Sequence, residues 1–253
     1  MIEARNLTFA VAEPACADVH WIGAAGSGQR DGAQLITDAG MGDVVYASYQ
    51  QLSAELAASG KTMTAEAVQY PAAPVPLGGG LGGWMDFMDS VDDGTDATAE
   101  QLEAFTARCP QTKVVLAGYS QGAMVVHRNL HDLADDPQIA AALLVADGDR
   151  LPGDTTINLG STAVLPGPGK GVAQEHSFLA GTDTSPLDAA MGARTVSVCD
   201  VGDPVCDHNP DIDEVPASAI AIHTAYAPTE GGLHAWGTPL YQLVMTSVGP
   251  GLG

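Results

Sequence analysis

Basic side chains are scarce in this sequence. Its 253 residues hold only 9 Lys and Arg against 31 Asp and Glu, which gives a formal net charge of −22 at pH 7. Nucleic acids and anionic membrane surfaces are bound through clusters of Lys and Arg. The charge balance therefore argues against both kinds of partner, and it bears on solubility more than on fold.

Long apolar runs are also lacking. No run approaches the ~20 apolar residues of a transmembrane helix, so we expect no membrane-spanning segment. Residues 1–12 have neither the basic start nor the long apolar core of a secretory signal. If the protein is exported, its signal has therefore already been removed from this sequence.

Cysteines are few and form no C-x-x-C motif. The four are Cys16, Cys109, Cys199 and Cys206. An even number without a metal-binding motif favours structural disulfides and an oxidising compartment. A zinc site built from Cys199, Cys206 and His208 is the alternative, although its spacing fits no usual zinc pattern.

Strand-like and helix-like patterns alternate along the chain. Short apolar runs predict strands at residues 18–24, 63–70, 114–117, 139–146 and 194–199. Helical spacing predicts helices at residues 43–58, 84–108 with a break near Gly94, 121–133 and 234–248. This alternation predicts an α/β fold, a three-layer α/β/α sandwich around a mostly parallel sheet. We expect one domain over residues 1–253.

A stretch rich in Gly, Pro and Thr interrupts this alternation at residues 147–193. Its weak periodicity predicts an irregular surface insertion, which together with the loop at 73–83 would shape a substrate groove. The acidic run at 207–214 is expected to be a solvated loop, because it lacks the spacing of a calcium-binding loop. For four large side chains, helical spacing favours core packing over contact with a substrate: Trp84, Met85, Phe87 and Met88.

The stretch KVVLAGYSQG at residues 113–122 carries the strongest chemical signal. An apolar strand runs directly into a helical pattern, so Ser120 lies on a sharp strand-to-helix turn of the form G-x-S-x-G. Gly118 and Gly122 leave room where a Cβ would clash with the neighbouring strand and helix. Such a turn exposes the serine oxygen above the sheet, and the helix start offers backbone N–H groups to an oxyanion.

A serine nucleophile needs a basic histidine and a carboxylate that orients it. In enzymes built on such a turn, the acid and then the base follow the serine along the chain. Asp203 lies in VCDVGDPVCDH, and His223 follows it in AIHTAYAP, after an apolar stretch and before a loop. His208 and His234 are rivals for the base. The other histidines are expected at the surface or on helix faces: His20, His127, His131 and His176.

Taken together, these motifs resemble the cutinase family of secreted serine esterases. The matching stretches run from about residue 16 to about residue 228 and read QYPA, SVDDG, CPQTKVVLAGYSQGAMVV, VCDVGDPVC and HTAY. The resemblance implies an α/β-hydrolase fold with no metal and no organic cofactor. It also implies a secreted enzyme that hydrolyses an ester in a lipid, cutin, an acetylated polysaccharide or a synthetic polyester. We expect this enzyme to be a monomer. The segment 147–193 is longer than the family's usual crossing at this point.

Residue roles follow from the same resemblance. Ser120 matches the nucleophile, Asp203 the acid and His223 the base. The oxyanion donors match the backbone N–H groups of Gln121 and Ser27. The implied disulfides join Cys16 to Cys109 and Cys199 to Cys206.

Two other functions stay open. One is a surface or binding protein that kept the fold without activity, although such a protein has no reason to retain Ser120, Asp203 and His223 together. The other is a phage-type hydrolase of mycolyl cell-wall esters, which shares the G-Y-S-Q-G turn. The two cysteine pairs favour the cutinase branch.

Overall fold

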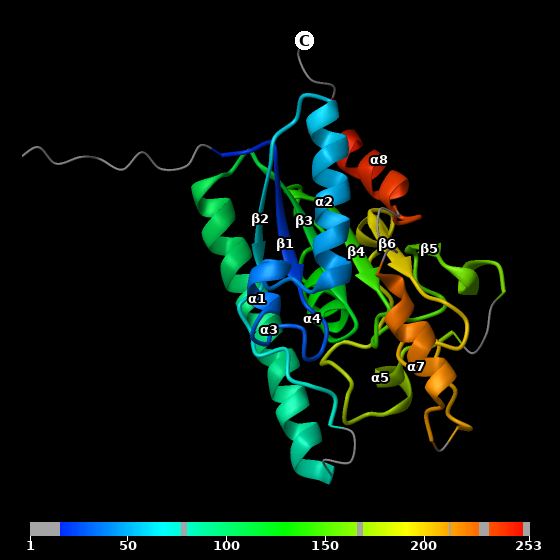
Figure 1. Cartoon of the computed structure of the whole chain (residues 1–253). Helices are drawn as coiled ribbons and strands as arrows, with labels where there is room; N and C mark the ends of the chain where they lie inside the picture. The colour runs from blue at the N-terminus through cyan, green and yellow to red at the C-terminus, as the bar shows by residue number, and fades with distance from the viewer. Residues whose placement is uncertain (1–15, 77–79, 166–168, 213, 228–232, 250–253) are drawn as a thin grey trace, which may run out of the picture.

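Six parallel strands form the centre of the molecule (Figure 1). The computed structural model of the chain describes residues 16–76, 80–165, 169–212, 214–227 and 233–249. Within them the sheet order is β2-β1-β3-β4-β6-β5. The strands are β1 (Val19–Ala24), β2 (Met63–Ala67), β3 (Lys113–Tyr119), β4 (Ile139–Val145), β5 (Ile157–Leu159) and β6 (Thr195–Val198).

Helices cover both faces of this sheet, as the alternating pattern predicts (Figure 1). One face packs against α2 (Asp43–Ala58) and α8 (Gly237–Val248). The other packs against α3 (Gly80–Arg108) and α4 (Gln121–Leu130). The expected three-layer α/β/α sandwich is therefore confirmed. The remaining short elements are α1 (Gln34–Thr37), α5 (Val172–Glu175), α6 (Ala189–Gly192), α7 (Ala217–His223) and the 3₁₀ turns Ser161–Ala163 and Thr224–Tyr226.

Side chains of the central strands alternate between the two helical layers. Trp21 and Val115 lie in the cluster with α2 and α8, whereas Ile22 and Leu116 lie in the cluster with α3 and α4. All of them are fully buried. A strand covered on both faces reads as an uninterrupted apolar run, which is why β1, β3 and β4 could be located from the sequence.

The helix expected to break near Gly94 is continuous. A Cβ at this position would come within 2.6 Å of Val125 on α4 and 2.7 Å of Tyr70. Glycine is therefore present because α3 passes close to α4 and to Tyr70, not because the helix ends there. The predicted break was wrong for this reason.

The segment 147–193 is more integrated than an irregular surface insertion. It contributes β5, which pairs in parallel with β6 at the edge of the sheet. It also buries Leu179, Leu187 and Met191 in the same cluster as α3 and α4. Its short elements and turns give no sustained periodicity, so their burial was not visible in the sequence.

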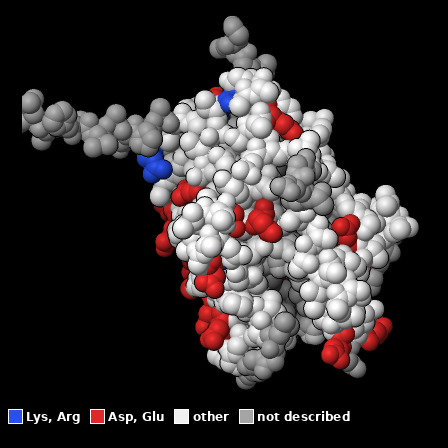
Figure 2. All heavy atoms as spheres, viewed as in Figure 1, with Lys and Arg blue, Asp and Glu red and all other residues white. Residues whose placement is uncertain are grey.

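Acidic side chains dominate the charged surface. Figure 2 shows Asp and Glu spread over one face of the molecule, with few Lys or Arg among them. In the described part of the chain, no helix combines the length and apolar character needed to cross a membrane. Both observations agree with the charge balance and the short apolar runs of the sequence.

Candidate active site

Ser120 lies between β3 and α4 in a strained turn. Its φ is 55° and its ψ is −118°, a conformation that residues other than glycine rarely adopt. A Cβ on Gly118 would collide with the carbonyl of Gly122, and one on Gly122 would collide with the carbonyl of Ala24. The two glycines therefore permit the close approach of strand and helix, as the G-x-S-x-G pattern predicts.

The turn lies at a switch point of the sheet. The chain passes from β1 to β2 on one side, and β3 lies on the other side of β1. The loops that follow β1 and β3 therefore diverge, which in open α/β sheets creates a crevice at the carboxyl ends of the strands. Ser27 follows β1 and Ser120 follows β3, so the topology brings both to this crevice.

His223 contacts Ser120 directly. Its Nε2 lies 3.0 Å from the Ser120 Oγ. The histidine is the last residue of α7, a short helix that the sequence analysis did not predict. The phenol ring of Tyr119 stacks on the imidazole with a centroid distance of 5.3 Å, and its hydroxyl donates a 2.6 Å hydrogen bond to the His223 carbonyl.

The two rival histidines have other hydrogen-bond partners than Ser120. His234 stacks on Trp236. Its backbone N–H donates to the side chain of Gln51 on α2, in the layer formed by α2 and α8. Burial lowers its pKa to about 4. The Nδ1 of His208 pairs with the Pro204 carbonyl at 3.2 Å. The structure thus brings His223, and neither rival, within hydrogen-bond distance of Ser120.

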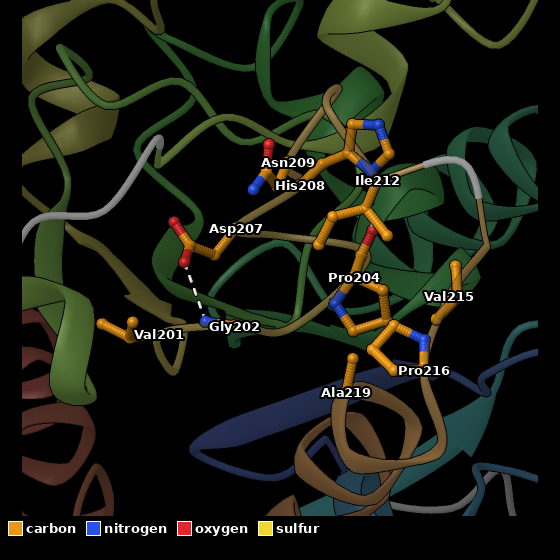
Figure 3. Close-up of a pocket in the computed structure, with 10 residues that line it drawn as sticks. All are labelled: Val201, Gly202, Pro204, Asp207, His208, Asn209, Ile212, Val215, Pro216 and Ala219. Carbon is orange, nitrogen blue, oxygen red and sulfur yellow. Dashed lines mark hydrogen bonds between the residues drawn. The ribbon is translucent and has the colours of Figure 1, made fainter.

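Asp207 stabilises the loop that carries Asp203, the candidate acid. Its carboxylate accepts a hydrogen bond from the Gly202 N–H at 2.8 Å (Figure 3) and another from the Gly169 N–H at 2.7 Å. Asp207 is buried, so the acidic run at 207–214 is not simply a solvated loop as expected; Asp213 lies outside the described residues. A small cavity of about 230 Å³ adjoins this loop, and Pro204, Ile212 and Ala219 of α7 are among the residues that line it. Figure 3 draws these lining residues.

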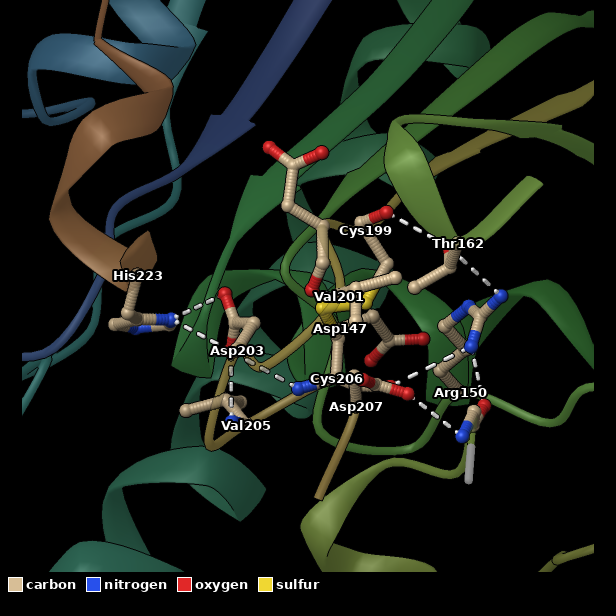
Figure 4. The surroundings of a disulfide bond; sticks show 12 residues. Asp147, Arg150, Thr162, Cys199, Val201, Asp203, Val205, Cys206, Asp207 and His223 are labelled. Atoms are coloured by element: carbon tan, nitrogen blue, oxygen red, sulfur yellow. Dashed lines mark hydrogen bonds and ion pairs between the residues drawn. A yellow bond between two sulfur atoms is a disulfide. The ribbon is translucent and has the colours of Figure 1, made fainter. Parts of the chain in front are cut away.

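Asp203 faces His223 from the same loop (Figure 4). Its two carboxylate oxygens lie 3.1 and 3.0 Å from the His223 Nδ1. The fully buried carboxylate also accepts backbone N–H groups from Val205 at 2.7 Å and Cys206 at 3.2 Å. These donors fix its direction. The Cys199–Cys206 disulfide closes the loop, and its sulfurs lie beside Asp203 in Figure 4.

The second disulfide joins Cys16 to Cys109, which ties the start of the described chain to the end of α3. Both pairs are those that the family resemblance implies. The alternative zinc site is excluded, because Cys199 and Cys206 are bonded to each other and cannot act as thiolate ligands.

Two backbone N–H groups, one on the loop after β1 and one on the turn after β3, are the candidate oxyanion donors. Among the described residues, neither the N–H of Gln121 nor that of Ser27 has an acceptor. The Gln121 side chain is held by Ser90 and Ala73, so its backbone is fixed at the start of α4. The Ser27 hydroxyl is buried and also has no described partner.

A groove of about 640 Å³ opens at Ser120 and His223. Trp84 and Phe87 line it and also pack with the core cluster of α3 and α4, as their helical spacing predicts, whereas Met85 is exposed. The segment 147–193 and the loop at 73–83, which contributes Val75, also shape it, as predicted. The individual lining residues were not predicted, because they come together only in the fold. They include Met124 from α4 and Val172, Phe178 and Leu179 from the segment 147–193.

Comparison with known proteins places this architecture in a family. The cutinase family model matches residues 15–235. The chain belongs to the cutinase family. Carboxylesterase Culp1 of Mycobacterium tuberculosis is 28% identical over 192 residues, which cover 76% of this chain and 69% of that protein. Acetylxylan esterase 2 of Talaromyces purpureogenus is 32% identical over 159 residues, 56% of this chain and 61% of that protein.

Solved structures share the fold of this cutinase-family chain. A cutinase-like protein from Cryptococcus sp. superposes with a TM-score of 0.61 over 92% of this chain and 96% of that one, at 18% sequence identity. The curated relatives named above are a carboxylesterase and an acetylxylan esterase, and both names denote ester hydrolysis. This cutinase-family chain is an ester hydrolase.

Proposed function

We propose that the protein hydrolyses carboxylic esters through an acyl-enzyme on Ser120, with His223 as general base and Asp203 as the residue that orients it. One observation carries this proposal. A continuous series of hydrogen bonds runs from the Ser120 Oγ to the His223 Nε2 and from the His223 Nδ1 to Asp203, with distances of 3.0 to 3.1 Å. This is the arrangement that activates a serine hydroxyl.

In the first half of the reaction, the Ser120 Oγ attacks the ester carbonyl carbon as its proton passes to the neutral His223 Nε2. Asp203 accepts from the Nδ1–H, which selects the tautomer with a free Nε2 and stabilises the imidazolium that forms. The imidazolium then gives its proton to the leaving alkoxide. The products of this half are an alcohol and an acyl-Ser120 ester.

Water completes the cycle. His223 takes a proton from water as the water oxygen attacks the acyl carbon, and it returns that proton to the Ser120 Oγ as the C–O bond breaks. A carboxylic acid leaves, and the enzyme regains its starting state.

The carbonyl oxygen becomes negative in both halves. We assign its donors to the backbone N–H groups of Gln121 and Ser27, which have no other acceptor among the described residues. Loss of one such donor typically lowers turnover by ~10²–10³.

An organophosphonate ester tests the nucleophile. We expect one equivalent to label Ser120, identified by peptide mass, and Ser120→Ala to lose both labelling and hydrolysis of p-nitrophenyl acetate. Activity within tenfold of the parent in that variant contradicts the mechanism. A parent protein that hydrolyses none of a broad panel of esters points instead to a binding protein.

Replacement of single histidines tests the base. His223→Gln should reduce turnover nearly as far as Ser120→Ala, whereas His208→Gln and His234→Gln should each keep most of it. Turnover should also fall as the solution is acidified, because a protonated imidazole cannot accept the serine proton. Equal losses in two of the three variants contradict the assignment.

We further propose that the protein is secreted and acts as a monomer, with esters of lipids, cutin, acetylated polysaccharides or polyesters as its range of substrates. Two disulfides support an oxidising compartment. Support for a monomer comes from the site, whose residues all belong to one chain.

A further inference from the structure

The two candidate oxyanion donors belong to separate loops that touch each other. Ser27 lies on the loop after β1, and Gln121 begins α4 after the turn that follows β3. A Cβ on Gly122 would lie only 2.5 Å from the Ala25 carbonyl oxygen, so the backbones of the two loops are packed together. Both donors must lie about 2.7–3.1 Å from one oxygen atom to stabilise it. The spacing between the loops therefore has to be fixed.

The loop after β1 is held on both sides of Ser27. The N–H before it, that of Gly26, donates to the Gln29 side-chain oxygen at 3.1 Å. The N–H after it, that of Gly28, donates to the Ala72 carbonyl at 2.7 Å. Between them, the Ser27 N–H has no acceptor among the described residues. The loop thus fixes the backbone around the one N–H that stays available.

The segment after β2 connects this loop to the other donor. Ala72 is 1% exposed and has a φ of 49°, which residues other than glycine rarely adopt. Its carbonyl accepts the Gly28 N–H, and the carbonyl of the next residue, Ala73, accepts from the Gln121 side-chain Nε2 at 3.3 Å. Ser90 on α3 holds this segment, because its hydroxyl accepts the Ala73 N–H at 3.0 Å. Backbone strain of this kind persists only where the surroundings hold it, and it concentrates at functional sites.

Tyr70 anchors the same segment to the loop after β1. Its hydroxyl donates to the carbonyl of Ala25, two residues before Ser27. Its ring packs against α3 where Gly94 leaves room, since a Cβ there would lie 2.7 Å from the ring. Burial raises the pKa of the Tyr70 hydroxyl, so the group stays protonated and remains a donor.

We propose that Tyr70 is a positioning residue for ester hydrolysis, which together with Ser90 and the strained Ala72 sets the spacing of the Ser27 and Gln121 N–H groups. The inference rests on the proposed function, because this spacing matters only if the substrate's carbonyl oxygen becomes negative during attack by Ser120. Tyr70 and Ser90 are not among the described residues that line the groove. They therefore act on the transition state through the donors and not on substrate binding.

Tyr70→Phe tests the role, because it removes the hydroxyl and keeps the ring. For p-nitrophenyl butyrate we expect kcat to fall by about tenfold to hundredfold, since a donor displaced by a fraction of an ångström loses part of its effect. KM should stay within about twofold of the parental value. The acid limb of the pH profile should also be unchanged, because His223 keeps its partners.

A trifluoromethyl ketone reports on the donors directly. The Ser120 Oγ adds to its carbonyl carbon, the serine proton passes to His223, and the ketone oxygen becomes an oxyanion that needs the same two N–H groups. Its inhibition constant for Tyr70→Phe should rise by the factor by which kcat/KM falls, as expected of a transition-state analogue. A hydroxyl that served only stability would leave this constant unchanged in the folded enzyme.

A second variant and a control accompany this test. Ser90→Ala removes the hydrogen bond to Ala73 and should change kcat and the inhibition constant in the same direction, so it decides the matter if Tyr70→Phe does not fold. Thr112→Val is the control. The buried Thr112 hydroxyl also donates to a distant carbonyl, that of Ala17 at 2.7 Å, but at the amino end of β3, the strand that Ser120 follows. This variant should keep the parental kcat and inhibition constant even if its melting temperature falls.

The outcomes separate this inference from the proposed function. If the parent hydrolyses esters through Ser120 but Tyr70→Phe and Ser90→Ala both keep its kcat and inhibition constant, the positioning role is wrong and the serine mechanism stands. A rise in KM at constant kcat also overturns the role, and an equal loss in Thr112→Val assigns the effect to general stability. If the parent hydrolyses no ester, the proposed function fails and the positioning role fails with it.

Discussion

Ser120 is held in its unusual backbone conformation by its neighbours. A positive φ in a residue other than glycine costs ~1–3 kcal/mol. The Ser120 N–H donates a 2.9 Å hydrogen bond to the Val145 carbonyl, and the flanking Gly118 and Gly122 allow the tight approach of backbone on both sides. The strain is thus compensated by the sheet and by α4, and it points the hydroxyl towards His223. Ten residues of sequence predicted the sharp turn at Ser120, but not the hydrogen bond to Val145 that helps to hold it.

Tyr119 holds His223, the hydrogen-bond partner of Ser120, in position. Its hydroxyl donates to the His223 carbonyl at 2.6 Å, and its ring stacks on the imidazole. Tyr119→Phe keeps the stack but removes the hydrogen bond to the part-buried His223 carbonyl, a loss worth ~1 kcal/mol. We expect kcat to fall about tenfold with KM nearly unchanged, because the hydroxyl touches the base and not the substrate.

A second tyrosine supplies the control. The Tyr241 hydroxyl pairs with Ser59 at 2.6 Å, on the α2 and α8 side of the molecule. Tyr241→Phe removes a hydrogen bond of the same type far from the site and should leave kcat at the parental value. Equal losses of kcat in the two variants would mean that Tyr119 acts only through general stability.

His127 is a buried charge, not a surface histidine as its helical position suggested. Its Nδ1 pairs with the Asp147 carboxylate at 2.6 Å, and Asp154 lies 4.0 Å from its Nε2. Burial alone lowers the pKa of His127, but Asp147, together with Asp149 and Asp154, outweighs burial and raises this pKa to about 9. These carboxylates follow β4 and are distant in sequence, so no local pattern could reveal the pair.

This raised pKa predicts a pH-dependent stability. An unfolded histidine titrates near pH ~6.5, so the folded protein binds the His127 proton more tightly. The stabilisation that this proton gives to the folded state is complete below pH ~6.5 and disappears as the pH rises through about 9. We expect the free energy of unfolding, from urea titrations at pH 6.5, 8 and 9.5, to decline by roughly 1–3 kcal/mol.

His127→Gln should be less stable than the parent at pH 6.5 and should lose most of this decline. His176→Gln changes an exposed histidine and should keep the parental pH dependence. A decline that persists unchanged in His127→Gln assigns the titration to another group.

At the scale of elements, long regular segments were predictable and short ones were not. The bounds predicted for α2 are those observed, because a helix of this length carries several turns of apolar spacing and ends at Ser59 and Gly60. By contrast, β5 has 3 residues and α7 has 7, too few to establish a period. Yet α7 carries His223, so the residue was identified by its motif and its helix was missed.

The two disulfides constrain different elements and should have separable effects. Cys16–Cys109 spans 93 positions of sequence, whereas Cys199–Cys206 spans 7 and encloses Asp203. Loop-closure entropy predicts that loss of the long link reduces stability by about 4–5 kcal/mol and loss of the short one by about 2–3 kcal/mol. Activity should show the opposite order, because only the short loop positions the carboxylate that orients His223.

Double serine variants of each pair test this. Cys16→Ser/Cys109→Ser should melt at lower temperature with kcat near the parental value while folded. Cys199→Ser/Cys206→Ser should melt closer to the parent but lose about tenfold or more in kcat, as expected for a misplaced acid. The reverse order of either effect contradicts the separation.

At the scale of the whole molecule, the sequence identified the layers, the chemistry and two segments that shape the groove, but not the individual residues that line it. Alternating strands and helices indicate a parallel sheet, and a serine after one of its strands must lie at the carboxyl edge. The groove is different, because its lining combines α3, α4 and the segment 147–193. Those contacts join residues far apart in sequence, and only the folded chain brings them together.

The net charge of −22 is also a property of the whole molecule, and it predicts that salt stabilises the fold. Like charges repel in the compact state, and the screening length shortens from ~30 Å at 0.01 M salt to ~8 Å at 0.15 M. At pH 7 we expect the melting temperature to rise by a few degrees over this range, since ~1 kcal/mol corresponds to ~2–4 °C for a chain of this size. NaCl and KCl should act alike, because screening does not depend on the identity of the monovalent cation. The effect should vanish near pH 4.2, the isoelectric point, where the net charge is zero. A melting temperature that is insensitive to salt at pH 7, or equally sensitive at pH 4.2, would show that the acidic surface does not destabilise the folded state.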